Sequence, residues 1–264
     1  MHLFNLKATI FSVLMASLPF ASHAKSMCAS YNGITVSMLT FDEAIANIKP
    51  FSPKGEFETT AAYKARLAAS ELKRPLIISK DLEDPKYIKY NADRGVFEVA
   101  SFLFDNTNFA AWDTFYWAKS DIRADTVFNI DVTISSTDVV TGSYVAQNSF
   151  GATATVIKIA RTEKAIFERK GSLNEDLFPR TKNSIIGEIP MNADEARKFK
   201  LEAKIAFVVV PKPPYIVKAS FQQGKPTIRN PREIRVDATV LIADIQCALL
   251  MNGNDTVVAA FETR

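Results

Sequence analysis

Runs of alternating apolar and polar residues in the C-terminal half constrain this fold more than any other feature of the sequence. From Ile234 to Ile242 every second residue is apolar, and the residues between them include an arginine, an aspartate and a threonine. The same period of two recurs over 128–134 and 215–221. Successive side chains of a strand point to opposite faces, so each run predicts a strand with one buried and one solvated face. Such strands are typical of an antiparallel sheet.

Two turn signals predict that some of these strands form hairpins. Residues 91–95 (NADRG) separate the apolar runs 86–90 and 96–104. Asn252 and Gly253 form the pair that most strongly favours a tight hairpin turn, and they precede the apolar residues Val257–Phe261.

Helical signals concentrate near the N-terminus. Thr40 and Glu43 stand three residues apart just before an apolar run with helical spacing, which predicts a capping box and a short helix. The alanine-rich segment 59–74 predicts a second helix, because alanine has the highest helix propensity. The spacing of Tyr63 and Leu67 predicts that they mark its buried side.

Together these patterns predict a single α+β domain. Residues 25–80 are expected to be mainly helical and residues 81–264 mainly strands, with one short helix capped by Asn192. We expect a sandwich-like antiparallel β-sheet core with the N-terminal helices packed on it. A chain of 264 residues, 47% of them apolar, is large enough to bury such a core.

The first 24 residues have the pattern of a secretory signal peptide. Lys7 precedes an apolar stretch at 8–18, and Ser22 and Ala24 are the small residues that a signal peptidase recognises. The apolar stretch is too short to span a bilayer, which needs roughly 20 apolar residues. We therefore predict cleavage after Ala24, no membrane span afterwards, and a periplasmic or secreted protein.

The positions of the histidines exclude several kinds of chemistry from the exported chain. The sequence has two, His2 and His23, and both lie within the predicted signal peptide. Without histidine there is no Ser-His-Asp triad, no Cys-His pair and no histidine-based zinc site. No glycine-rich phosphate loop is present, so we expect no cofactor. With no histidine, two cysteines and no EF-hand spacing, we expect no metal. A net charge of +3 does not favour nucleic acid as a partner.

The two cysteines, Cys28 and Cys247, predict one disulfide. An exported chain with two cysteines commonly pairs them. The bond would tie the start of the mature chain to a strand near its end.

One short segment resembles a motif of known proteins. Residues 54–67 (KGEFETTAAYKARL) are similar to a KGEFETTAxYxARLA box that occurs in uncharacterised exported bacterial proteins. The resemblance implies a bacterial envelope setting, and it carries no catalytic residue or ligand with it. From the residues themselves, Phe57 is expected to tuck under the first turn of the second helix.

Two further segments are candidates for contact with a partner. Trp112, Tyr116 and Trp117 stand within a short aromatic segment that holds both tryptophans of the chain, and aromatic residues often anchor interfaces. The other reading of this segment is core packing. A basic run follows later and could face an anionic partner or simply water; it comprises Lys212, Lys218, Lys225, Arg229, Arg232 and Arg235.

These observations leave three functional hypotheses. The first is a non-enzymatic binding or accessory module of the bacterial envelope, with an envelope protein or glycan as its partner. The second is a carboxylate-dependent hydrolase of envelope or extracellular polysaccharide, for which adjacent acids such as Asp42-Glu43 and Asp194-Glu195 would have to converge with others in a cleft. The third is an inhibitor or immunity protein against a secreted toxin.

Overall fold

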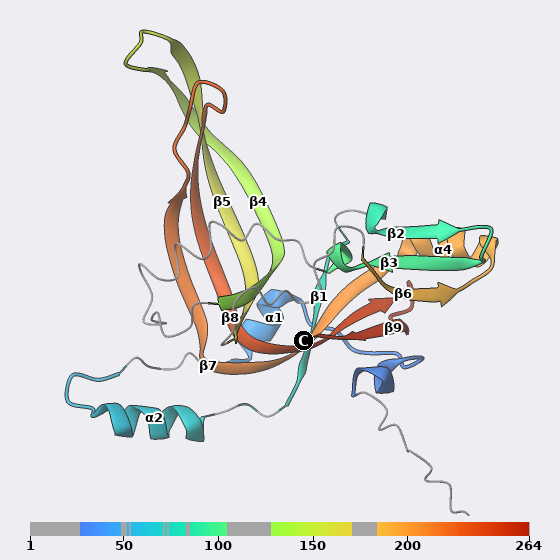
Figure 1. The fold of residues 1–264 in the computed structure, drawn as a ribbon. Coiled ribbons are helices and arrows are strands. Elements are labelled where there is room, and N and C mark those ends of the chain that lie inside the picture. The colour runs from blue at the N-terminus through green and yellow to red at the C-terminus, as the bar shows by residue number, and fades with distance from the viewer. Residues whose placement is uncertain are drawn as a thin grey trace, which may run out of the picture.

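The computed structural model describes residues 27–48, 52, 54–70, 72, 74–82, 85–104, 128–170 and 184–263. Within these ranges strands dominate, in two sheets (Figure 1). The larger sheet has the order β1-β7-β8-β5-β4, and β9 pairs with part of β8. Its strands are β1 (Leu76–Lys80), β4 (Phe128–Gln147), β5 (Thr153–Lys170), β7 (Lys204–Gln223), β8 (Arg232–Met251) and β9 (Val257–Glu262).

The smaller sheet has the order β2-β3-β6 and is antiparallel. Its strands are β2 (Ile88–Asn91), β3 (Val96–Ala100) and β6 (Ile185–Pro190). The predicted turn at 91–95 joins β2 to β3, and the predicted Asn252-Gly253 turn joins β8 to β9. Both predicted hairpins are therefore confirmed.

The larger sheet is mixed, which differs from the expected antiparallel core. β5 and β8 run parallel over eleven register pairs, from Ile157↔Arg232 to Phe167↔Ile242, whereas the other pairs in this sheet are antiparallel. The parallel pair arises because β4–β5 and β7–β8 are two separate hairpins laid side by side. A period of two in the sequence shows which face of a strand is buried but carries no information on the direction of its neighbour.

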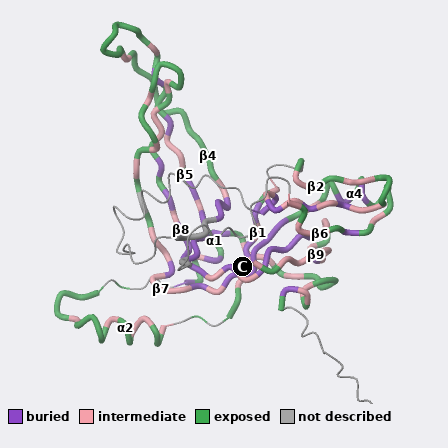
Figure 2. Tube along the Cα trace, in the orientation of Figure 1, coloured by how far each residue is buried: buried purple, intermediate pink, exposed green. Residues whose placement is uncertain are grey.

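The core lies at the base of the larger sheet, where the sheet curls. Its end strands β1 and β4 approach each other there, and the concave face encloses a large apolar cluster that includes Ile78, Val132, Ile166 and Phe207. The smaller sheet and two helices complete this cluster. Figure 2 shows the buried residues concentrated in this region, which we call the base.

The two long hairpins extend well beyond the base (Figure 1). We call their outer part the arm end and define it as residues 139–160 of the β4–β5 hairpin and residues 218–235 of the β7–β8 hairpin. The hairpins are joined there, because the amide of Ile157 donates to the carbonyl oxygen of Pro231 at 2.9 Å. Buried residues are few within 139–160: only Val156 and Ile159 are buried.

The helices have the predicted caps but not the predicted packing. In α1 (Phe41–Ala46), Thr40 and Glu43 form the predicted capping box, and Phe41 and Ala44 are buried. Asn192 likewise caps α4 (Ala193–Glu202), with Glu195 completing the box. In α2 (Thr60–Ala69), by contrast, no residue is buried, and the helix meets the larger sheet at its C-terminal end, where the Tyr215 hydroxyl donates to the carbonyl oxygen of the C-cap residue Ser70.

The predicted α+β architecture with N-terminal helices packed on a sandwich-like core is therefore wrong. The chain is predominantly β, with a curled mixed sheet and a second sheet. Tyr63 and Leu67 are only half-buried, and Phe57 is 94% exposed instead of tucked under α2. The physical reason is that the concave face of the curled sheet is already filled by α1 and the smaller sheet. Helix propensity predicts that these residues form a helix, but it does not predict which surface the helix packs against.

The predicted disulfide is confirmed. Cys28 and Cys247 are bonded, their Cα atoms are 5.6 Å apart, and both residues are almost completely buried. The bond fastens the short helix η1 (Cys28–Tyr31) to β8, and apolar residues of β7, β8 and β9 surround it.

Candidate functional site

The arm end exposes more large apolar side chains than any other described part of the chain. Phe150 is 94% exposed, Val145 72% and Val140 68%. A soluble monomer rarely exposes a cluster of this kind, and such clusters often mark interaction sites. The complete set at the arm end is Val139, Val140, Tyr144, Val145, Phe150, Ile157 and Ile228.

The loop between β4 and β5 holds Phe150 at its apex. The Asn148 side-chain oxygen accepts hydrogen bonds from the backbone amides of Phe150 and Ala152, both at 3.0 Å. Gly151 follows Phe150 with a φ of +83°, a conformation that favours glycine. Asn148 bonds the amides of this turn, and Gly151 adopts its left-handed conformation, so the turn is formed without any contact from the Phe150 side chain. The phenyl ring projects into solvent.

The second loop of the arm end presents another apolar residue in the same way. Thr227 and Asn230 exchange backbone hydrogen bonds at 3.0 and 3.2 Å, which closes a four-residue turn. Ile228 and Arg229 are its two central residues, and both are exposed. An apolar side chain therefore stands at the apex of each hairpin.

Exposed cations accompany these apolar residues. Five exposed cations of the predicted basic run fall in the β7–β8 hairpin, and none of the five forms an ion pair with a described residue: Lys218, Lys225, Arg229, Arg232 and Arg235. Lys212, by contrast, lies closer to the base and pairs with Asp244 at 3.2 Å.

Acidic residues are scarce in this part of the molecule. Between 218 and 235 the only acid is Glu233, and between 139 and 160 there is none. The Glu233 carboxylate accepts a hydrogen bond from the Tyr144 hydroxyl at 2.8 Å, which raises the pKa of that tyrosine. The arm end is thus both apolar and positively charged.

A polar cluster centred on Arg161 lies on the face of the larger sheet just below the arm end. Its guanidinium donates two hydrogen bonds to Asp138, at 2.6 and 2.8 Å, and a third to Gln223 at 2.9 Å. Glu163 lies 3.8 Å from the same guanidinium. Apolar residues of the second core cluster, among them Val236 and Ala238, flank these groups in the adjacent strand.

The two carboxyl groups of this cluster are perturbed in opposite directions. Hydrogen bonds from Arg161 hold the pKa of Asp138 below its ordinary value. Burial raises the pKa of Glu163, although the positive charge of Arg161 opposes the shift, and the nearby Asp138 adds to it. Arg161 donates its hydrogen bonds to Asp138 and Gln223 and none to Glu163, so its positive charge offsets the burial of the Glu163 carboxylate only in part.

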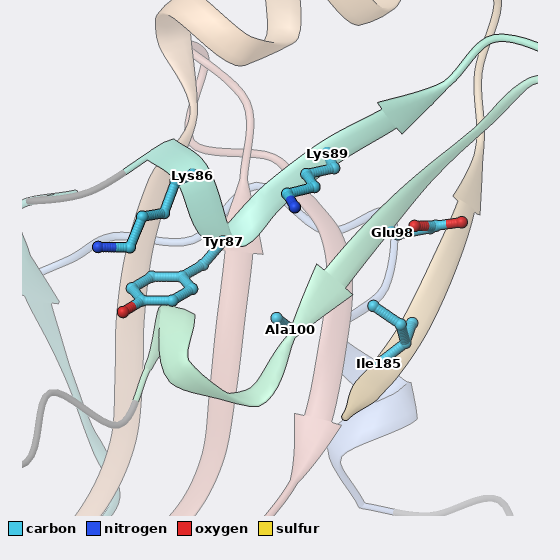
Figure 3. A pocket seen from close by; sticks show the side chains of 6 residues that line it. All are labelled: Lys86, Tyr87, Lys89, Glu98, Ala100 and Ile185. Atoms are coloured by element: carbon cyan, nitrogen blue, oxygen red, sulfur yellow. The ribbon is translucent and has the colours of Figure 1, made fainter. Parts of the chain in front are cut away.

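A separate pocket of about 420 Å³ lies over the smaller sheet (Figure 3). Its lining combines two lysines, a tyrosine and one carboxylate with two apolar residues: Lys86, Tyr87, Lys89, Glu98, Ala100 and Ile185. The ammonium group of Lys86 sits 4.7 Å from the centre of the Tyr87 ring, a cation–π contact. Glu98 accepts a hydrogen bond from Asn91 at 3.1 Å and pairs with Arg94.

The sequence-predicted partner residues Trp112, Tyr116 and Trp117 lie outside the described residues. Of the adjacent acids, Glu43 and Glu195 complete capping boxes, which lowers the pKa of Glu43. Asp42 pairs with Lys164 and Asp194 with Arg197. These two acidic pairs have structural roles in the described chain and do not converge on the pocket.

The apolar residues of the arm end were not predicted from the sequence. One signal in the sequence could have revealed them. Over 139–160, valines and isoleucines occupy strand positions that point to both faces of the sheet, and no residue is acidic. A strand with apolar residues on both faces is normally buried on both faces. Here both faces are open to solvent.

In the described part of the chain, no group of three or more His, Cys, Asp or Glu side chains could hold a metal ion. No helix among the described residues is long and apolar enough to cross a membrane. Comparisons of this chain with protein families, with curated proteins and with solved structures find no match.

Proposed function

We propose that this protein is a non-enzymatic binding or accessory protein of the bacterial envelope and that the arm end is its binding surface. The observation that carries this proposal is the cluster of exposed apolar side chains at the arm end, headed by Phe150, Val145 and Val140. Exposing such residues to water is unfavourable by roughly 25 cal/mol for each Å² of apolar area. Their burial against a partner would remove that cost.

The disulfide supports the envelope setting. A disulfide between two almost completely buried cysteines is typical of proteins that fold in an oxidising compartment, such as the periplasm. Export itself rests on the signal-peptide pattern of residues 1–24, which lie outside the described residues. An inhibitor or immunity protein would be one special case of the same binding function.

The hydrolase alternative has less support. The described pocket contains one carboxylate, Glu98, which already bonds to Asn91 and Arg94. Glycoside hydrolysis commonly uses two carboxyl groups about 5 to 9.5 Å apart across a cleft. Glu163 and Asp138 do lie near each other, but Arg161 stands between their charges and neither lines the pocket.

Site-specific photo-crosslinking in producing cells tests the proposal. A photoreactive amino acid replaces Phe150 at the arm end, and a matched control replaces Leu201, which is 85% exposed on α4. The proposal expects a defined adduct, identified by mass spectrometry, at position 150 but not at 201. Equal labelling at both positions, or no adduct at 150, would contradict it.

A further inference from the structure

We propose that the arm end docks on a bilayer that carries anionic phospholipid headgroups, an inference that rests on the proposed binding function and names its partner. Two observations combine here. Apolar side chains stand at the apices of both hairpins, and exposed arginines lie beside two of the exposed isoleucines, since Arg229 follows Ile228 and Arg232 is the register partner of Ile157. Amphipathic helices that lie in a membrane interface combine apolar residues with lysines and arginines in the same way.

The two hairpins place the apolar and the basic residues on one end of the molecule. Ile157 of β5 is the register partner of Arg232 of β8, so the two side chains are neighbours on the same face of the sheet. In the turn at 227–230, Ile228 is followed directly by Arg229. An approaching surface would therefore meet both kinds of side chain together.

The charge balance of the arm end suits an anionic surface. Between 218 and 235 five lysines and arginines face one acid, and that acid is hydrogen-bonded to Tyr144. Between 139 and 160 Lys158 is the one charged residue, and its ammonium lies 5.2 Å from the centre of the Tyr144 ring. Each lysine or arginine near an anionic membrane contributes about 1 kcal/mol of attraction, equivalent to about a fivefold gain in affinity.

The distribution of apolar residues favours a lipid surface over an acidic protein. Val140 and Val145 lie on one face of the β4–β5 hairpin, as their register partners Ile159 and Thr155 show, and Tyr144 lies on the other face. The exposed apolar residues thus surround the arm end. A protein partner typically buries one contiguous area with good shape complementarity. Immersion of the β4–β5 apex in the headgroup region would cover the residues nearest to that apex on both faces at once, Val145 on one face and Tyr144 on the other.

Vesicle co-sedimentation tests this inference with the purified protein. We expect binding to phosphatidylcholine vesicles that contain about 30 mol% phosphatidylglycerol, no binding to pure phosphatidylcholine vesicles, and a loss of binding as salt rises from about 50 mM to about 500 mM. Absence of sedimentation with the anionic vesicles, or equal binding to both vesicle types, would overturn the inference.

Paired variants tie any vesicle binding to the arm end. The double variant Lys225→Glu/Arg229→Glu should reduce affinity by about tenfold or more. Its control, Lys64→Glu/Lys198→Glu, makes the same change in net charge at exposed positions of α2 and α4 and should bind normally. Phe150→Ser should weaken binding by about tenfold, whereas Leu201→Ser should not. Equal losses in test and control variants would count against docking through the arm end.

The crosslinking experiment distinguishes a failure of the lipid inference from a failure of the proposed binding function. A lipid adduct at position 150 supports both. A protein adduct at position 150 together with no vesicle binding overturns the lipid inference and leaves the binding function in place. Absence of any adduct together with absence of vesicle binding removes both.

Discussion

Arg161 shows how one side chain can set the charge state of its neighbours. Asp138 receives two hydrogen bonds from it, and Glu163 lies beside it without one. The pKa of Asp138 is lowered and that of Glu163 is raised. In the folded state, the ionised form is therefore stabilised at Asp138 and destabilised at Glu163, so the two carboxyl groups affect stability in opposite ways.

The first prediction concerns Glu163→Gln. The pKa of Glu163 in the folded protein is raised above its ordinary value of 4.5. The ionised carboxylate therefore destabilises the fold at pH values above the folded pKa, and this destabilisation is absent below about pH 4.5. The variant should melt about 2–4 °C higher than the wild type near pH 7.5. The difference should shrink towards about pH 4, where both side chains are neutral. Thermal denaturation at the two pH values measures this.

Asp138→Asn is the matched variant, and we expect it to destabilise the protein at neutral pH where Glu163→Gln stabilises it. The folded pKa of Asp138 lies below its ordinary value of 3.8, so its stabilising effect is present above that pH and is lost as the pH falls through the folded pKa. The variant should lose about 1 kcal/mol of stability at neutral pH, since the pair is partly exposed and screened by water. Stabilisation by Asp138→Asn, or a pH-independent effect of Glu163→Gln, would contradict this account of the cluster.

At the scale of elements, β6 can lie against β9 because it has a glycine at the contact. A Cβ atom added at Gly187 would come within 2.5 Å of the Phe261 ring. Phe261 in turn packs against Phe104, with the ring centres 5.5 Å apart. The phenyl ring fills the space above Gly187, and this contact helps to join the smaller sheet to the larger one.

The second prediction is that Gly187→Ala destabilises the protein by about 1–3 kcal/mol, because the added methyl group overpacks a filled site. Chemical denaturation measures the loss. Gly55→Ala is the control, since its new Cβ would meet nothing closer than 3.7 Å. Replacement of Phe261 by leucine in the Gly187→Ala background should recover part of the loss. An unchanged unfolding midpoint in Gly187→Ala would show that the sheets do not depend on this contact.

The third prediction concerns the disulfide between η1 and β8. Cys28 and Cys247 are 219 residues apart in sequence, and a cross-link that closes so long a loop contributes about 5 kcal/mol in the chain-entropy account. The variant Cys28→Ser/Cys247→Ser should lose about 2–5 kcal/mol of stability. Denaturant titration measures the loss, and thiol counting of the unreduced wild type should find no free thiol. Two reactive thiols in the wild type would refute the pairing.

The sequence allowed the local structure to be predicted better than the assembly. Strand faces, helix caps and hairpin turns depend on neighbouring residues, so Thr40, Asn192 and Asn252 could be interpreted correctly. The disulfide followed from counting cysteines. The parallel β5–β8 pair could not be predicted, since alternation is the same in parallel and antiparallel neighbours. The exposed position of α2 was missed because its half-apolar face resembles that of a packed helix.

The candidate site was missed for a related reason. An apolar residue in a strand is normally assigned to the core, and Val140, Val145 and Phe150 give no local sign that nothing described covers them. Their exposure results from the length of the hairpins relative to the core, which is a property of the assembled sheet. The basic run, in contrast, was found in the sequence, and its place beside the apolar apices became visible only in the structure.

At the scale of the whole molecule, burial separates the base from the arm end (Figure 2). In the base, β8 is buried at nearly every position from Val240 to Met251. In the arm end, the β4–β5 hairpin keeps its backbone ladder but buries only Val156 and Ile159. Segments with solvent-exposed backbone hydrogen bonds and few buried apolar contacts open locally at a lower free energy than the core does. The two regions should therefore open with different free energies.

The fourth prediction is that hydrogen exchange distinguishes these regions. Amides over 141–155 should exchange about a hundredfold faster than those over 206–210 and 247–251, because the arm end can open locally whereas the base exchanges only on global unfolding. Mass spectrometry of exchanged peptides measures this, with α2 as an internal reference for a segment without buried residues. Equal protection in both regions would show that the arm end unfolds together with the base. An arm end that opens locally can adjust its apolar side chains to a surface while the disulfide-linked base stays folded.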